Sequence, residues 1–230
     1  MAAPPPREIV LVHSPLVGPS SLAPTAEALE RRGFRTYTPC IDGSDVAWRE
    51  APAAVLAALP ELSGPLLVGH SAAGLLLPAL AAPLKAWGMI VIDGRLPPPA
   101  GPTPPAEPEF DAFVKALPVE QGRLPKWSHW WGPGGVAALI PDRWIRKVFE
   151  ADLPRLRPEW FDDAVETPPW DHLRAGYLQT SPRLADQAAL ARARGWPVQT
   201  LSGTHLHPFL HPGETALAIS QLVTAMARAV

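Results

Sequence analysis

The residues with the clearest potential for chemistry are Gly69-His70-Ser71-Ala72-Ala73-Gly74, which follow a short apolar run. A nucleophilic serine on a tight strand-to-helix turn needs small residues two positions before and two positions after it. These positions hold Gly69 and Ala73, and the second glycine stands one residue later, at Gly74. The helix N-terminus favours negative charge that develops beside the serine. We therefore predict a nucleophile at Ser71, and the alternative is a serine that only caps the helix.

A histidine-rich stretch, Ser202-Gly203-Thr204-His205-Leu206-His207-Pro208, lies near the end of the chain. In one known arrangement of a serine nucleophile, the acid and then the histidine follow the serine along the chain. This order favours His205 as the general base for Ser71, with His207 and His211 as competitors. Three histidines at this spacing can also bind a metal. No carboxylate or cysteine stands among them, so we expect no metal site.

The acid that would orient the histidine is harder to place. The stretch that follows the fifth expected strand is where such an acid commonly stands, and its one carboxylate is the late Asp186. Asp93, in Val91-Ile92-Asp93-Gly94, ends the preceding strand and occupies the other known position. We predict Asp93 as the acid and keep Asp186 as the alternative. An aspartate at a strand end can also be a plain turn residue, and without an acid the histidine tautomer is held less firmly.

The backbone donors for an oxyanion form the next expectation. One donor is the N–H that follows the nucleophile, at Ala72. The other comes from the loop after the first strand, but Pro15 stands at the usual position and has no N–H, which leaves Leu16. Loss of one such donor typically costs about 100- to 1000-fold in rate. We also expect four polar side chains from these stretches to contact the substrate: His13, Ser14, His70 and His207.

An unusual insert interrupts the chain between residues 95 and 172. It holds 15 of the 31 prolines and 6 of the 9 tryptophans. Its position after the fourth expected strand is where a lid would cover Ser71. Trp127, Trp130 and Trp131 can wall an apolar substrate pocket, and the alternative is that they pack the lid onto the rest of the protein.

Alternating apolar runs and helical patterns define the fold class. We expect six strands, at 8–13, 35–41, 65–69, 88–93, 176–180 and 196–201, with helices between them. This alternation predicts an α/β fold with a mostly parallel, doubly wound sheet of six or more strands. The core comprises residues 1–94 and 173–230, and the lid comprises residues 95–172. Ligands bind outside the carboxyl ends of such strands, where Ser14, Ser71, Asp93 and His205 fall.

Composition excludes several other classes of protein. The net charge of -2 gives no basic footprint for nucleic acid. The single cysteine, Cys40, permits no internal disulfide and fits a reducing compartment, so we expect a cytoplasmic protein. We find no secretory signal, no segment able to span a bilayer and no phosphate-binding glycine loop. We predict a small-molecule substrate, no cofactor, and neither a nucleic-acid nor a membrane partner.

These stretches together resemble the α/β-hydrolase superfamily over nearly the whole chain. The resemblance rests on 13–19, the turn around Ser71, Val91-Ile92-Asp93, 130–132, 193–198 and His205-Leu206-His207. More narrowly, the chain is similar to a group of small actinobacterial-type atypical members that includes the bottromycin epimerase. That group implies that the fold also serves biosynthetic steps other than hydrolysis, among them proton abstraction beside a carbonyl.

Three functions follow from these observations. The first is a serine hydrolase of an ester, thioester or lactone of a small, largely apolar compound, such as a secondary metabolite. The second is an epimerase, cyclase or lyase in which His205 or Asp93 acts as acid or base without an acyl-enzyme. The third, a binding protein without catalysis, is opposed by the presence of both Ser71 and His205. The first two differ in whether Ser71 becomes acylated.

Overall fold

A six-stranded parallel sheet forms the centre of the protein, as the sequence predicts. The computed structural model describes residues 4–132 and 134–228. The strand order is β2-β1-β3-β4-β7-β8, and all neighbouring pairs are parallel. The strands are β1 (Glu8–Val12), β2 (Arg35–Tyr37), β3 (Leu66–His70), β4 (Gly88–Ile92), β7 (Arg174–Gln179) and β8 (Val198–Thr200).

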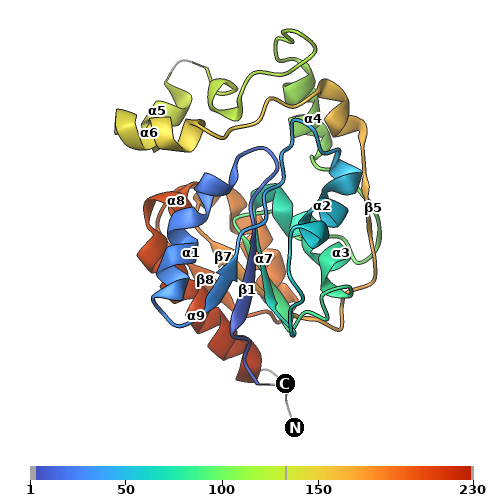
Figure 1. Ribbon diagram of the computed structural model, residues 1–230, viewed down its shortest axis with the longest axis vertical. Helices are drawn as coiled ribbons and strands as arrows, with labels where there is room; N and C mark the ends of the chain where they lie inside the picture. The colour runs from blue at the N-terminus through green and yellow to red at the C-terminus, as the bar shows by residue number, and fades with distance from the viewer. Residues whose placement is uncertain (1–3, 133, 229–230) are drawn as a thin grey trace.

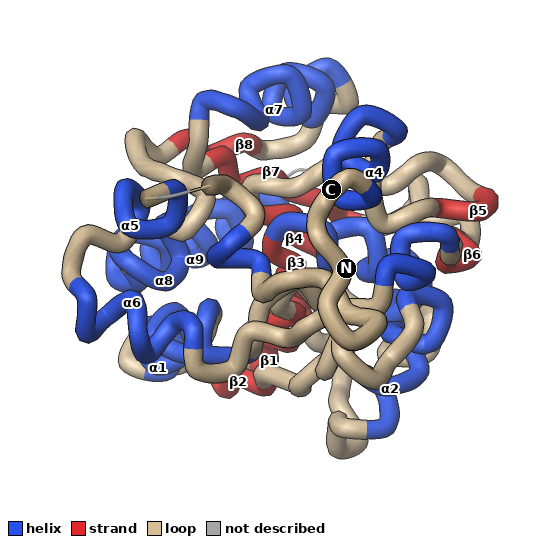
Figure 2. Tube along the Cα trace, turned by 90° about the horizontal axis from the view of Figure 1, so that it is seen from above, coloured by secondary structure: helices blue, strands red, loops and turns tan. Residues whose placement is uncertain are grey.

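Helices cover both faces of this sheet (Figures 1 and 2). One face packs against α1 (Ala23–Glu30) and α9 (Pro212–Arg228). The other face packs against α2 (Ala51–Ala57), α3 (Leu77–Ala81) and α7 (Ala185–Ala193). Within β1, β3 and β4, successive side chains enter these two cores in turn, and nearly all are fully buried. Such continuous Val, Ile and Leu runs are typical of parallel strands that are buried on both faces.

The chain between β4 and β7 forms the insert, which rises over the carboxyl ends of the strands (Figure 1). It contains β5 (Gly101–Thr103), α4 (Pro108–Lys115), α5 (Gly135–Leu139), α6 (Arg143–Glu150) and β6 (Val165–Thr167). Strands β5 and β6 pair as an antiparallel ribbon apart from the main sheet. The remaining helical elements are α8 (His207–Leu210) and the short 3-10 turns η1 (Pro19–Ser21), η2 (Trp48–Glu50), η3 (Ser71–Leu76), η4 (Trp127–His129), η5 (Pro158–Asp162) and η6 (Pro182–Leu184).

Buried aromatic side chains and polar bonds tie the insert to the rest of the protein. The indole of Trp48 donates to the carbonyl of Thr103 in the insert, and the indole of Trp160 in the insert donates to the carbonyl of Val46. Asp152, just after α6, accepts bonds from both the backbone and the hydroxyl of Ser20. Apolar residues of the insert and of the sheet share one continuous core. The insert is therefore a packed cover over the strand ends.

Candidate active site

Ser71 lies at the sharp turn between β3 and η3. Its φ of 58° places it in the left-handed region, which a residue other than glycine occupies only at some cost. A Cβ at Gly69 would come within 2.9 Å of the backbone of Ala73. A Cβ at Gly94 would collide with the carbonyl oxygen of Ser71. The turn is therefore possible because its neighbours are small, and it projects Ser71 from the end of the strand.

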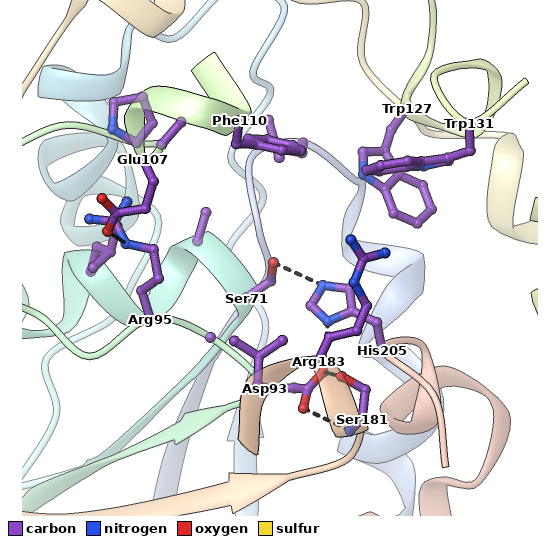
Figure 3. Close-up of a pocket in the computed structure, with 17 residues that line it drawn as sticks. Ser71, Asp93, Arg95, Glu107, Phe110, Trp127, Trp131, Ser181, Arg183 and His205 are labelled. Atoms are coloured by element: carbon purple, nitrogen blue, oxygen red, sulfur yellow. Dashed lines mark hydrogen bonds and ion pairs between the residues drawn. The ribbon is translucent and has the colours of Figure 1, made fainter. Parts of the chain in front are cut away.

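Three side chains from different strand ends form a hydrogen-bonded chain (Figure 3). The Nε2 atom of His205, in the loop after β8, lies 3.0 Å from Ser71 Oγ. Its Nδ1 atom lies 2.8 Å from Oδ2 of Asp93, which directly follows β4. A carboxylate can only accept here, so Nδ1 carries the proton and donates it to Asp93. The lone pair of Nε2 then faces the hydroxyl of Ser71, as a general base requires.

The Asp93 carboxylate is buried, and each of its oxygens accepts two bonds. Oδ1 accepts the backbone N–H groups of Thr180 and Ser181, at 2.9 and 2.8 Å. Oδ2 accepts the Ser181 hydroxyl at 2.7 Å, besides the imidazole. Burial alone would raise the pKa of Asp93, but the bonds from His205, Ser181 and Thr180 outweigh it and lower the pKa below its usual value. Asp93 therefore stays ionised beside the histidine.

The structure separates the two acids that the sequence left open. Asp186 lies exposed in the first turn of α7. No hydrogen bond joins Asp186 to His205 in the described part of the chain, whereas Asp93 is bonded to it. The position after β7 holds Ser181, whose side chain supports Asp93. Sequence reasoning missed this role because it searched that position for a carboxylate.

The two expected oxyanion donors belong to residues that line the same cavity as Ser71. Ala72 follows the nucleophile at the start of η3. Leu16 lies in a turn that the N–H of Val17 closes on the carbonyl of Ser14, at 3.0 Å. The Leu16 N–H also points to the Ser14 hydroxyl across a long 3.3 Å contact. The Leu16 donor is thus partly engaged within its own turn.

Two buried histidines that we expected to contact the substrate bind the backbone instead. The Nδ1–H of His13 donates to the Ser14 carbonyl at 2.9 Å, and its Nε2 accepts the N–H of Ile41 at 3.0 Å. The Nε2–H of His70 donates to the His205 carbonyl at 2.9 Å. Burial lowers the pKa of His13, and burial with the neighbouring His205 lowers that of His70 to about 3. Both rings are therefore neutral, and neither lines the described cavity.

Three further side chains that we expected to contact the substrate are also buried away from the cavity. Ser14 is buried, and Trp130 is buried with its indole N–H bonded to the Pro125 carbonyl at 2.7 Å. His207 is buried under the loop and stacks on His211, with ring centres 4.6 Å apart. Burial, followed by the charge of His211, lowers the pKa of His207. None of the three is among the described residues that line the cavity.

A cavity of about 270 Å³ opens above Ser71. Trp127 and Trp131 line it, as expected, and Phe110 of α4 adds to this aromatic roof (Figure 3). Its described lining is Leu16, Ser71, Ala72, Leu75, Asp93, Gly94, Arg95, Pro105, Ala106, Glu107, Phe110, Trp127, Trp131, Ser181, Arg183, Leu184 and His205. The sequence did not single out the insert residues from 95 to 110 or Arg183 and Leu184, because no local pattern marks them.

In residues 4–132 and 134–228, no group of three or more His, Cys, Asp or Glu side chains could hold a metal ion. No helix in that part of the chain is long and apolar enough to cross a bilayer.

The strand order, the sharp turn and the hydrogen-bonded triad define an α/β-hydrolase fold. The model of the alpha/beta hydrolase family matches residues 9–218, so the chain belongs to this family. No curated protein sequence matches the chain.

Similar solved structures include enzymes named as a hydrolase and an esterase, and one named as a synthase. A pyrethroid hydrolase from Sphingobium faniae is 22% identical, with a TM-score of 0.61 over 95% of this chain and 97% of that one. Methylketone synthase I from tomato is 14% identical, with a TM-score of 0.70 over 96% of this chain and 99% of that one. A polyneuridine aldehyde esterase is 14% identical, with a TM-score of 0.69 over 94% and 98%. At these identities the likeness establishes the fold.

Proposed function

We propose that the protein is a serine hydrolase that cleaves an ester, thioester or lactone of a small, largely apolar compound. The observation that carries this proposal is the unbroken chain from Ser71 Oγ through His205 to Asp93, with bonds of 3.0 and 2.8 Å. All three residues line a cavity that a substrate can enter. A serine becomes a nucleophile when a histidine within hydrogen-bond reach can take its proton and a carboxylate orients that histidine.

In the proposed reaction each of these groups carries out one step of acyl transfer. Ser71 Oγ attacks the substrate carbonyl while His205 Nε2 takes the hydroxyl proton. Asp93 stabilises the imidazolium that forms, because it is already ionised beside Nδ1. The N–H groups of Ala72 and Leu16 hold the developing oxyanion. His205 then protonates the leaving alcohol or thiol, and water, activated by the same histidine, hydrolyses the acyl-enzyme.

A second candidate is a non-hydrolytic enzyme, as in the group that includes the bottromycin epimerase. The observation in its favour is the weak oxyanion site: Pro15 has no N–H, and the Leu16 N–H already contacts the Ser14 hydroxyl. In this function His205 or Asp93 moves a proton beside a carbonyl, and Ser71 forms no covalent bond.

Labelling with a fluorophosphonate separates the two functions. One adduct per chain on the wild-type protein, and none on Ser71→Ala, supports the hydrolase. Absence of an adduct on a folded wild-type protein, with solvent deuterium entering a bound carbonyl compound, supports the second function. A panel of aryl esters and thioesters then defines the acyl length that the cavity accepts.

A further inference from the structure

Among the described residues, four charged side chains line the cavity besides His205, and three of them already have hydrogen-bond or ion-pair partners in the protein. Both oxygens of Asp93 accept hydrogen bonds, among them one from the His205 imidazole. The guanidinium of Arg95 pairs with Glu107 across 2.6 Å at one end of the cavity. The fourth charged side chain is Arg183.

Arg183 has no ion-pair partner among residues 4–132 and 134–228. It lies in η6, two residues after Ser181, whose backbone N–H is bonded to Asp93. The backbone that carries Arg183 is therefore anchored to the triad. Figure 3 shows its side chain extending past His205, with the guanidinium toward the Trp127 side of the cavity.

The cavity thus combines an apolar roof with one cation that pairs with no carboxylate among the described residues. Phe110, Trp127 and Trp131 supply aromatic surface. A guanidinium remains charged at any ordinary pH and binds a carboxylate through two parallel N–H bonds. An apolar compound with one anionic group satisfies both features, because its hydrocarbon part contacts the rings while the anion contacts Arg183.

We propose that the substrate of this cavity carries an anionic group, most simply a carboxylate separate from the reacting carbonyl, and that Arg183 binds it. This inference rests on the proposed hydrolase function for the nature of the reaction.

Equilibrium binding tests the inference without any turnover. The probes are 4-phenylbutyrate and its uncharged amide, and calorimetry measures their binding to Ser71→Ala protein. We expect the acid to bind at least about tenfold more tightly than the amide, since a hydrogen bond to a charged group exceeds a neutral one by that order. The preference should weaken as salt is added, because Arg183 is solvent-accessible.

Substitution identifies the residue responsible. In the same Ser71→Ala background, Arg183→Met should abolish the preference for the acid, and Arg183→Lys should keep part of it. Arg32→Met, at an exposed site beyond α1, is the matched control and should retain the full preference. Equal affinity for acid and amide, no measurable binding of the acid, or a preference that survives Arg183→Met would each overturn the inference.

Hydrolysis supplies the second arm of the test. The matched substrates are the mono-4-nitrophenyl ester of suberic acid and 4-nitrophenyl octanoate. Arg183→Met should lower kcat/KM for the charged ester at least about tenfold more than for the neutral one, chiefly through KM. Equal losses on the two esters would contradict the inference.

The two arms distinguish failure of this inference from failure of the proposed function. If Ser71 is no nucleophile, neither ester is cleaved and the fluorophosphonate fails, yet the acid still binds better than the amide. If Arg183 binds no substrate anion, labelling and cleavage persist while the preference for the acid is missing.

Discussion

Replacing Asp93 by asparagine tests the triad with little change of shape. The φ of Asp93 is 44°, a left-handed conformation that asparagine also tolerates well. Oδ1 accepts the N–H groups of Thr180 and Ser181, so the amide oxygen of the substituted side chain must take that position. Its NH2 group then occupies the Oδ2 position, where it can only donate toward His205 Nδ1.

This exchange moves the proton of the imidazole to the wrong nitrogen. Nδ1 of His205 must now accept, so the proton lies on Nε2 and faces Ser71. The histidine can no longer take the serine proton. A wrong tautomer of this kind lowers kcat by about 10⁴ in a serine protease triad, which corresponds to about 5.5 kcal/mol of lost transition-state stabilisation. We expect a loss of this order for Asp93→Asn in steady-state cleavage of a 4-nitrophenyl ester.

The control for this experiment is the other acid that the sequence offered. Asp186→Asn, at the exposed start of α7, should keep kcat within about twofold, because surface substitutions away from a site have small effects. Circular dichroism and the unfolding midpoint show whether Asp93→Asn remains folded. The reasoning is refuted if folded Asp93→Asn keeps more than a tenth of kcat, or if Asp186→Asn loses as much.

Three other substitutions test contacts around the site. Ser181→Ala removes the hydroxyl bonded to Asp93 and should lower the free energy of unfolding by about 1.5–3 kcal/mol in urea titrations; an unchanged midpoint would contradict this. His70 has a pKa of about 3 in the folded chain and about 6.5 when unfolded, so the unfolded chain alone takes up its proton as the pH falls between these values. Relative to pH 7 this costs about 2 kcal/mol of stability at pH 5, and His70→Gln should lose less on acidification than the wild type; parallel pH profiles of stability would exclude this role. Asp152→Ala breaks two bonds to Ser20 and should speed amide hydrogen exchange in residues 143–152, whereas unchanged exchange would show that these two bonds do not stabilise α6.

Much of the fold could be predicted because its strands carry local signals. All six expected strands occur, and β1, β3 and β4 are the apolar runs that the sequence marks, although the strand expected at 35–41 already ends at Tyr37. The sharp turn at Ser71 follows from its small neighbours. The first helix shows the limit of such signals. Ser20 and Ser21 suggest an N-cap, yet they form a 3-10 turn, and Ser20 bonds to Asp152, 132 positions away. A distant partner of this kind leaves no trace in the local pattern.

Side-chain roles around the site were less predictable than their positions. Chain order was enough to favour His205, because the strand ends of a parallel sheet converge. His70 and His207 are also polar and lie within two residues of Ser71 and of His205 in the sequence, but they are buried. Whether a histidine contacts substrate or backbone depends on which loop packs above it. The same holds for Trp130, which packs inside the insert, while Trp131 reaches the cavity.

The most direct test of the account is whether Ser71 carries an acyl group during turnover. Wild-type protein is mixed rapidly with a 4-nitrophenyl ester, the first release of 4-nitrophenol is recorded, and acid-quenched samples are analysed by intact mass and peptide mapping. The proposed serine mechanism predicts a burst approaching one equivalent per chain and an acyl adduct on the peptide that contains Ser71, both absent from Ser71→Ala. Turnover with no adduct on this peptide, or with the same rate in Ser71→Ala, would contradict it.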